Sequence, residues 1–286
     1  MDGVLLIDKP KDYTSRDIVN IVSKKLNTKK VGHTGTLDPL ATGVLVVCVG
    51  RATKLVEYLT CTYKEYEADI ILGIKTDTAD ITGNILKEEK TIIEKEQIEE
   101  VLNSMIGFYM QQVPIYSAVK VNGKKLYEYA RENKNIELPK RQVEIKTLEL
   151  LNIEQKEDKT ILKIKTLVSK GTYIRSLIED IASNLNTIGT MSNLKRIKQG
   201  NFNIKDCYNL NDIENNNFKL ISIEEILKDI YSIEVDNELE FKIKNGSIID
   251  NVYNKDLINF TKNGKILATY EIYKKDSNKL KPYRMF

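Results

Sequence analysis

The chain has 286 residues, of which 41% are hydrophobic and 30% are charged, and it carries a formal net charge of +3. This balance is typical of one large or two modest globular domains, and it excludes a disordered chain. No apolar run is long enough to cross a bilayer, the three cysteines form no Cys-x-x-Cys pair, and the N-terminus lacks the pattern of a signal peptide. We therefore expect a cytoplasmic protein without membrane or metal sites.

The first two predicted elements are a short apolar strand over residues 3–7 and a helix that begins after Thr14. Asp17 stands three residues after Thr14, which is the spacing of a capping box. Lysines gather where this helix ends, and cations at that position pair with the helix dipole or contact phosphate groups. The sequence leaves both roles open for Lys24, Lys25, Lys29 and Lys30.

Residues 31–43 are the most informative segment, and they contain the only histidine of the chain, His33. Three glycines and Pro39 surround a single carboxylate, Asp38. Glycine permits backbone angles that other residues avoid, and proline favours an extended residue before it, so we expect an ordered loop with Asp38 at its tip. Many Asp-Pro pairs only brace a turn. Here an apolar run at 44–49 follows, and a buried strand would hold the carboxylate rigidly, as a functional site requires.

The middle of the chain combines a half-buried strand with a basic, tyrosine-rich segment. Alternation of apolar and charged residues predicts the strand over 63–73, on which Tyr66 faces either the core or a cleft. An Asn-Gly pair at 122–123 predicts a tight turn. Lysines and tyrosines alternate after it, over 124–131, in a pattern typical of an RNA-binding surface and also of a solvated helix.

A second informative segment leads into a helix and contains an arginine at an unusual position. The apolar stripe that follows residues 169–175 predicts a helix capped by Gly171 or Thr172. Tyr173 and Arg175 lie in its first turn, away from the apolar stripe. Because an arginine there opposes the positive end of the helix dipole, we expect a carboxylate or a phosphate group beside it.

The distribution of predicted elements indicates an α+β fold with a mixed, mostly antiparallel sheet. Two further strands, at 141–154 and 159–168, and an amphipathic helix at 98–105 belong to the main domain. Asparagine-rich residues 208–217 suit a linker or a surface loop. Lys-Asn-Gly triplets at 244–246 and 262–264 predict hairpin turns in a small β-rich domain. We divide the chain into a main domain, a linker with a helical segment, and this small domain: 1–206, 207–234 and 235–286.

Four segments, in this order, resemble the TruB family of bacterial tRNA pseudouridine-55 synthases. They are GVLLIDKP at 3–10, GHTGTLDPLATG at 32–43, KKLYEYAR at 124–131 and SKGTYIR at 169–175. The resemblance implies the pseudouridine synthase fold, in which helices flank a mostly antiparallel central sheet, followed by a PUA-like RNA-binding domain. It also implies a monomer that binds the T-arm of tRNA and needs no cofactor.

The resemblance implies that the T-loop uridine is flipped out, and that its base is detached from the sugar, turned and rejoined through carbon. Asp38 would act as the nucleophile or stabilise the detached sugar, with Arg175 as its ion-pair partner. Tyr66 would stack on the target base and move a proton. Tyr173 would line the pocket, and His33 would replace the flipped base in the loop stack. Further substrate or RNA contacts are assigned to Lys9, Lys120, Lys124, Arg196 and Ile197.

Two other functions compete with this interpretation. One is a non-catalytic RNA-binding or tRNA-folding protein, against which the presence of Asp38, Tyr66 and Arg175 together argues. The other is a phosphate-binding enzyme that uses the glycine-rich loop. Residues 31–43 lack the Gly-Lys-Ser/Thr ending of a P-loop, which argues against that enzyme.

Overall fold

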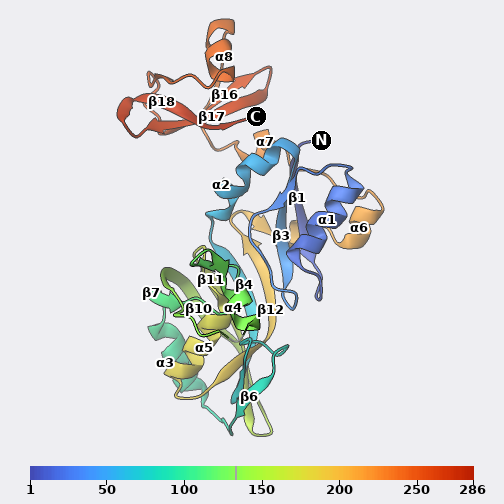
Figure 1. Ribbon diagram of the computed structural model, residues 1–286, viewed down its shortest axis with the longest axis vertical. Helices are drawn as coiled ribbons and strands as arrows, with labels where there is room; N and C mark the ends of the chain where they lie inside the picture. Colours follow the sequence, from blue (N-terminus) through green and yellow to red (C-terminus); the bar gives the residue numbers. More distant parts are fainter. Residues whose placement is uncertain (133) are drawn as a thin grey trace.

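The computed structural model describes residues 1–132 and 134–286, and it shows an elongated molecule with a mixed α+β main body and a β-rich lobe at one end (Figure 1). The strands of the main sheet are β1 Gly3–Lys9, β2 Val31–His33, β3 Thr42–Val49, β4 Lys64–Leu72, β7 Gly107–Gln112, β10 Lys140–Lys156, β11 Lys159–Val168, β12 Gly189–Gln199 and β13 Phe202–Asn203. Their order is β1-β3-β12-β4-β11-β10-β7, with β2 paired to β3 and β13 to β12. Within the described residues these pairs are antiparallel except for β3 with β12, which confirms the predicted sheet.

Helices cover the two halves of this sheet separately. In one half, α1 packs on β1 and β3 through Ile18 and Val22. In the other half, α3 packs on β10 and α5 packs on β12 and β4, and Ile98, Leu177 and Ile181 of these helices belong to one core. In the described part of the chain, no helix is both long and apolar enough to cross a membrane. The helical segments are α1 Ser15–Lys25, η1 Gly50–Leu55, α2 Val56–Thr60, α3 Lys95–Ser104, α4 Leu126–Arg131, α5 Ile174–Asn184, η2 Ile204–Asp206, α6 Leu210–Glu214, α7 Ile223–Ile226 and α8 Asn237–Lys244.

The two halves of the sheet meet where β3 and β12 run parallel, with Lys195 opposite Thr42 and Arg196 opposite Gly43. Gly43 has a φ of +100°, and a Cβ built on it would lie 2.2 Å from the carbonyl oxygen of Arg196. Only glycine fits so close an approach of two backbones. The Asp38 loop, which we define as residues 34–41, lies immediately before this junction. Its buried residues Leu37, Leu40 and Ala41 belong to the core beneath α3 and α5.

Several local predictions are confirmed. The Thr14 side chain accepts a hydrogen bond from the Asp17 backbone, and Asp17 accepts one from the Thr14 backbone, as in a capping box. Buried and half-buried residues alternate along the whole of β4, with Tyr66 on the buried side. Two minor hairpins complete the body, and in the second the turn residues Asn122 and Gly123 have φ values of 52° and 81°. Their strands are β5 Ile74–Thr76 with β6 Ile85–Glu88, and β8 Lys120–Val121 with β9 Lys124–Lys125.

Three local predictions are wrong, each for a physical reason. Residues 208–217 do not form a loose linker, because α6 begins at a capping box on Asn209 and buries Ile213 against the core beneath α1. Asn245 and Gly246 end helix α8 in place of a hairpin turn, since a glycine with positive φ suits both structures. Helix α5 is preceded by Tyr173 as its N-cap residue, and neither Gly171 nor Thr172 caps it.

The β-rich lobe contains five strands in the order β14-β16-β17-β18-β15 around a core that includes Phe260 and Tyr270. It is joined to the main body by Arg284, which donates to the Lys54 carbonyl at 2.8 Å and forms an ion pair with Glu57. β14 adds the residues just before position 235 to this sheet. The strands are β14 Ser232–Glu234, β15 Ile249–Asp250, β16 Leu257–Lys262, β17 Lys265–Tyr273 and β18 Asp276–Met285.

Candidate active site

A cavity of about 440 Å³ lies beside the junction of the two half-sheets. Residues 34–38 of the Asp38 loop form one wall, residues 116–118 form another, and residues 170–175 before α5 form a third. Strands β4 and β12 contribute side chains between these walls. The structure thus brings together five of the predicted site residues as lining groups: Asp38, Tyr66, Tyr173, Arg175 and Arg196.

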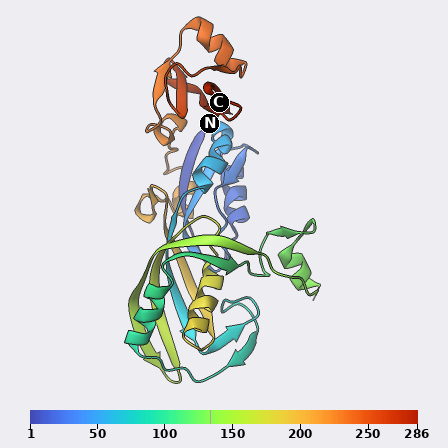
Figure 2. The same cartoon turned by 90° about the vertical axis from the view of Figure 1, so that its left-hand side faces the viewer.

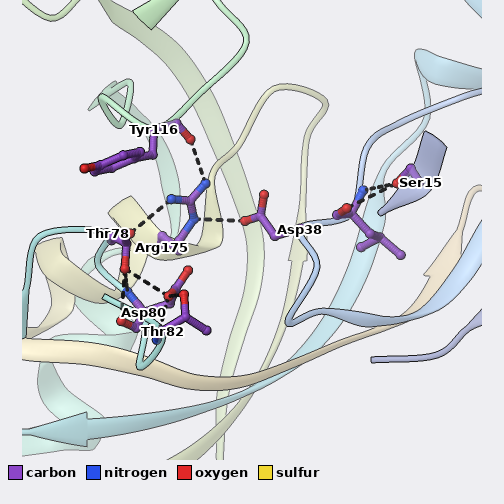
Figure 3. Close-up of polar contacts among 8 residues, drawn as sticks. Ser15, Asp38, Thr78, Asp80, Thr82, Tyr116 and Arg175 are labelled. Carbon is purple, nitrogen blue, oxygen red and sulfur yellow. Dashed lines mark hydrogen bonds and ion pairs between the residues drawn. The ribbon is translucent and has the colours of Figure 1, made fainter. Parts of the chain in front are cut away.

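Arg175 forms the expected ion pair with Asp38, with 2.9 Å between Nε and Oδ2 (Figure 3). Its two terminal nitrogens donate to the carbonyl oxygens of Thr78 and Tyr116, each at 3.0 Å. The guanidinium therefore joins three segments that are far apart in the sequence. The Arg175 side chain is only 6% exposed, whereas that of Asp38 is 36% exposed. The carboxylate is oriented by a buried cation and remains open to a ligand in the cavity.

The Thr78 carbonyl is itself held in place by a tight polar turn (Figure 3). Asp80 Oδ1 accepts hydrogen bonds from the Thr78 hydroxyl at 2.9 Å and from the Thr82 backbone at 3.0 Å. Asp80 is nearly fully buried, so this carboxylate organises the turn from inside. This role of Asp80 beside Arg175 was not predicted from the sequence.

The Asp38 loop is fixed by side chains from distant elements. The hydroxyl of Ser15, in the first turn of α1, accepts a hydrogen bond from the Leu37 backbone at 2.9 Å and donates to the Leu37 carbonyl at 3.2 Å (Figure 3). Gln199, at the end of β12, donates to the Thr34 hydroxyl. A loop without sheet partners must satisfy its backbone in this way. These contacts hold the part of the loop that precedes Asp38.

Lys9 and Arg196 belong to the same set of contacts, and of the two only Arg196 lines the cavity among the described residues. Lys9 is 0% exposed and Arg196 is 1% exposed. The Lys9 amine donates to the Pro39 carbonyl at 3.3 Å, and Arg196 donates to the Gly35 carbonyl at 3.0 Å. Burial lowers the pKa of Lys9 to about 8, although Asp38 and Asp12 oppose that shift. Both cations donate to backbone carbonyls of the Asp38 loop, and Arg196 in addition lines the cavity.

Ile197, predicted as a substrate or RNA contact, does not line the cavity, whereas Leu194 of the same strand does. Successive side chains of a strand point to opposite faces of a sheet. On β12 this pleat turns Leu194 and Arg196 toward the cavity and Ile197 away from it. Which of Leu194 and Ile197 lines the cavity depends on the register of β12. The sequence analysis did not predict a strand there.

The remaining predicted residues lie around the cavity. Tyr66 is buried in its floor, and Tyr173 lies in its wall with the Arg141 guanidinium 5.4 Å from the ring centre. His33 is half-buried on β2, and burial, followed by Arg196 and Arg16, lowers its pKa. The imidazole is therefore neutral at pH 7. Lys120 and Lys124 lie on the β8–β9 hairpin, outside the cavity lining.

Gln111 on β7 explains why α5 begins without a local cap. Its amide oxygen accepts a hydrogen bond from the Tyr173 backbone at 2.8 Å, and its amide nitrogen donates to the Tyr173 carbonyl at 3.0 Å. The Gln111 side chain of β7 thus forms hydrogen bonds with the backbone at the start of α5, and it positions both Tyr173 and Arg175. No pattern near residues 169–175 indicates this partner.

Lys64 and Ser117 also line the cavity and were not predicted as site residues. For Lys64, the sequence contains a pattern that indicates its burial. Lys64 alternates with Tyr66 along β4, so the same periodicity that buries the tyrosine also buries this lysine. Ser117 is buried, and its hydroxyl oxygen has no hydrogen-bond partner among the described residues. Together with the Asp38–Arg175 pair, the cavity offers a nucleophilic carboxylate, aromatic walls and several cations, which suits a nucleotide-sized anionic ligand.

Comparisons with known proteins agree on one family. Residues 23–174 match the model of the TruB family pseudouridylate synthase (N terminal domain). Proteins named tRNA pseudouridine synthase B are 42% identical in Oceanobacillus iheyensis, covering 100% of this chain and 98% of the relative, and 45% identical in Clostridium kluyveri, covering 86% and 84%. A structure of an H/ACA RNP bound to a substrate RNA containing 2'-deoxyuridine matches with a TM-score of 0.71 at 21% identity, covering 99% of this chain and 84% of that one. That level of identity supports the shared fold.

Proposed function

The chain belongs to the TruB family of pseudouridylate synthases, and from that premise we propose how it isomerises uridine to pseudouridine in tRNA. The target uridine is flipped out of its stack into the cavity beside Asp38. The bond between N1 of uracil and C1′ of ribose breaks, the base turns, and C5 joins C1′. C5 then loses its proton and N1 gains one, so that the product is an isomer of the substrate.

Asp38 carries the reaction in this proposal, as the nucleophile or as the charge that stabilises the detached sugar. The observation that supports this role is the ion pair of a partly exposed Asp38 with a buried Arg175. Arg175 orients the carboxylate, and the contacts of Ser15 and Lys9 keep the loop backbone from shifting as the base turns.

The aromatic residues act on the base. Tyr66 stacks on the uracil from the cavity floor and moves a proton, and Tyr173 closes the opposite side. His33 stacks in the place that the flipped base leaves, a role for which a neutral imidazole is suited because it costs little to remove from water. We assign no acid–base role to His33.

We further propose that the substrate is uridine 55 in the T-arm and that the enzyme acts as a cytoplasmic monomer without a metal or cofactor. Three free cysteines support a reducing compartment. Lys120 and Lys124 would contact the T-arm from the hairpin beside the cavity. The catalytic domain is assigned to residues 1–206 and a PUA-like RNA-binding domain to residues 235–286, with 207–234 between them.

The decisive experiment replaces Asp38 by Asn and measures tritium release from tRNA labelled at C5 of uridine. D38N is expected to bind tRNA within about threefold of the unmodified protein and to release no tritium above background, because the carboxylate acts only in the chemical steps. Asp12→Asn provides a matched control, since Asp12 is exposed and only its backbone contacts the loop, at the Pro39 carbonyl. Measurable turnover by D38N, with D12N normal, would contradict the assignment.

A further inference from the structure

One end of the cavity carries positive charge that no carboxylate balances. Lys64 of β4, Lys170 before α5 and Arg196 of β12 all line it. Among the described lining residues Asp38 is the one acid, and it is already paired with Arg175. A cavity lined by one sign of charge attracts and holds a ligand of the opposite sign.

Lys64 is one of the two buried cations among these three, the other being Arg196. Its side chain lies on the buried face of β4, and the residue is 7% exposed. Nζ donates to the carbonyl oxygens of Thr60 at 3.0 Å and Thr62 at 2.9 Å. An ammonium group has three N–H donors, so one remains without a partner among the described residues. Burial, followed by Arg196, lowers the pKa of Lys64 to about 8.

The groups that face Lys64 from neighbouring elements do not supply a counter-ion. A Cβ built on Gly35 would lie 3.5 Å from both Lys64 Cε and Arg196 Nη1, so the two cations converge on the Asp38 loop. Lys170 raises the positive charge from the other side, and its amine lies 3.2 Å from the Cys61 sulfur. Burying a cation without a counter-ion costs free energy, and an anionic ligand offsets that cost.

We propose that Lys64 binds a phosphodiester group of the RNA backbone adjacent to the flipped nucleotide, with the exposed Lys170 beside it at the cavity mouth. This inference rests on the proposed function, because it takes RNA as the ligand. A phosphate held at Lys64 fixes one end of the nucleotide while its base is released and turned. Lys64 is then a positioning and binding residue, and Asp38 remains the group that meets the sugar.

The proposal predicts proton uptake when RNA binds. The free protein has Lys64 partly neutral above pH 8, whereas a bound phosphate favours the ammonium form. Affinity for RNA should therefore fall as the pH rises above 8, by up to about tenfold per pH unit. Lys64→Arg keeps a permanent charge and should flatten this dependence while retaining most of the affinity. Lys9 also has a pKa of about 8, but its amine is buried against backbone carbonyls. Because K64R retains Lys9, a pH dependence caused by Lys9 would persist in this variant.

The main test combines variants with modified RNA. Single-turnover pseudouridine formation, measured over a range of enzyme concentrations, gives an apparent Kd and a limiting rate for each T-arm stem-loop. One RNA set carries a neutral methylphosphonate at one of the linkages flanking the target uridine. Lys64→Met should raise the Kd by about tenfold on unmodified RNA and lower the salt slope by about 0.7 to 0.9. The limiting rate should change by less than about threefold.

At one linkage the methylphosphonate should weaken binding to the unmodified enzyme by a similar factor and cause no further loss with K64M. The measurement on the unmodified enzyme does not depend on the stability of any variant. Lys163→Met is the matched control, because Lys163 is an exposed lysine of the neighbouring strand β11 paired with Glu67. The proposal would be overturned if the methylphosphonate and K64M had additive effects on the Kd at every linkage. A lower limiting rate of K64M with an unchanged Kd would also overturn it. Either result with an active unmodified enzyme leaves the proposed function standing.

Discussion

The Asp38 loop and the neighbouring arm, which we define as residues 113–132, form two walls of the same cavity but are built in opposite ways. The loop is held by buried side chains from α1, β1 and β12, and Arg196 lies 161 positions away from the Gly35 carbonyl that it contacts. The arm projects from the body (Figure 2) and is held mostly by its own contacts, such as Leu126 to Val119 at 2.9 Å. The geometry of the proposed catalytic loop therefore rests on long-range packing, whereas that of the adjacent arm depends on local structure.

This difference has a physical basis. A carboxylate that must meet one carbon atom requires a backbone that is fixed in several directions, and only distant elements can supply contacts from several directions. A surface that accepts a folded RNA needs shape and charge more than a single geometry. Arg175 connects the two walls, because it contacts Asp38 of the loop and the Tyr116 carbonyl of the arm.

Breaking this connection should produce the largest effect. Arg175→Met removes the partner of Asp38 and both carbonyl contacts, and we expect the single-turnover rate to fall by about a thousandfold. Arg175→Lys keeps the charge but cannot span three acceptors, so it should recover little of the rate. Rates and Kd values are measured by tritium release over a range of enzyme concentrations. Near-normal activity of R175K would mean that charge alone is required.

Loosening the loop should produce an intermediate effect. Ser15→Ala removes both hydrogen bonds to Leu37, and we expect the limiting rate to fall by about tenfold to a hundredfold with Kd within about twofold. Ser23→Ala is the matched control, because Ser23 lies on the same helix and bonds only the Thr28 carbonyl. Equal losses in S15A and S23A would indicate general destabilisation of α1 and no specific role in the loop.

Hydrogen exchange compares the two walls directly. Amides of the Asp38 loop that are bonded to buried groups, such as Leu37 to Ser15, should exchange at least about tenfold more slowly than amides of the arm. Tyr127, which donates to the Ser117 carbonyl at 3.1 Å, is a suitable arm amide for comparison. Equal protection in the unmodified protein would remove the contrast between long-range and local support.

The smallest effect is expected from the lysines near the end of α1. This helix of 11 residues begins at Ser15, so at 1.5 Å per residue its far end lies about 15 Å from the contact with Leu37. Replacing the four lysines by glutamine should raise the Kd for tRNA by about threefold and lower its salt slope, with the limiting rate unchanged. A loss above tenfold would place the RNA path along α1. The residues are Lys24, Lys25, Lys29 and Lys30.

The sequence alone was sufficient for features that depend on neighbouring residues. The capping box at Thr14 and the alternation along β4 arise from periodicity and turn chemistry, and both are present. The dipole argument predicted a carboxylate or a phosphate group beside Arg175, the family resemblance named Asp38 as its partner, and the structure contains this ion pair. An arginine in the first turn of a helix opposes the positive end of the helix dipole, and a nearby anion offsets this cost.

Tertiary structure decided the roles of groups whose partners are remote. Lys9 and Arg196 look like any cations in the sequence, and only burial makes them supports of the loop. The register of β12 selected Leu194 over Ile197, and a glutamine on β7 caps α5. Whether a charge meets solvent, a carbonyl or a ligand depends on which distant elements pack around it. Local propensity determines the elements, and the packing of those elements determines what each polar side chain does.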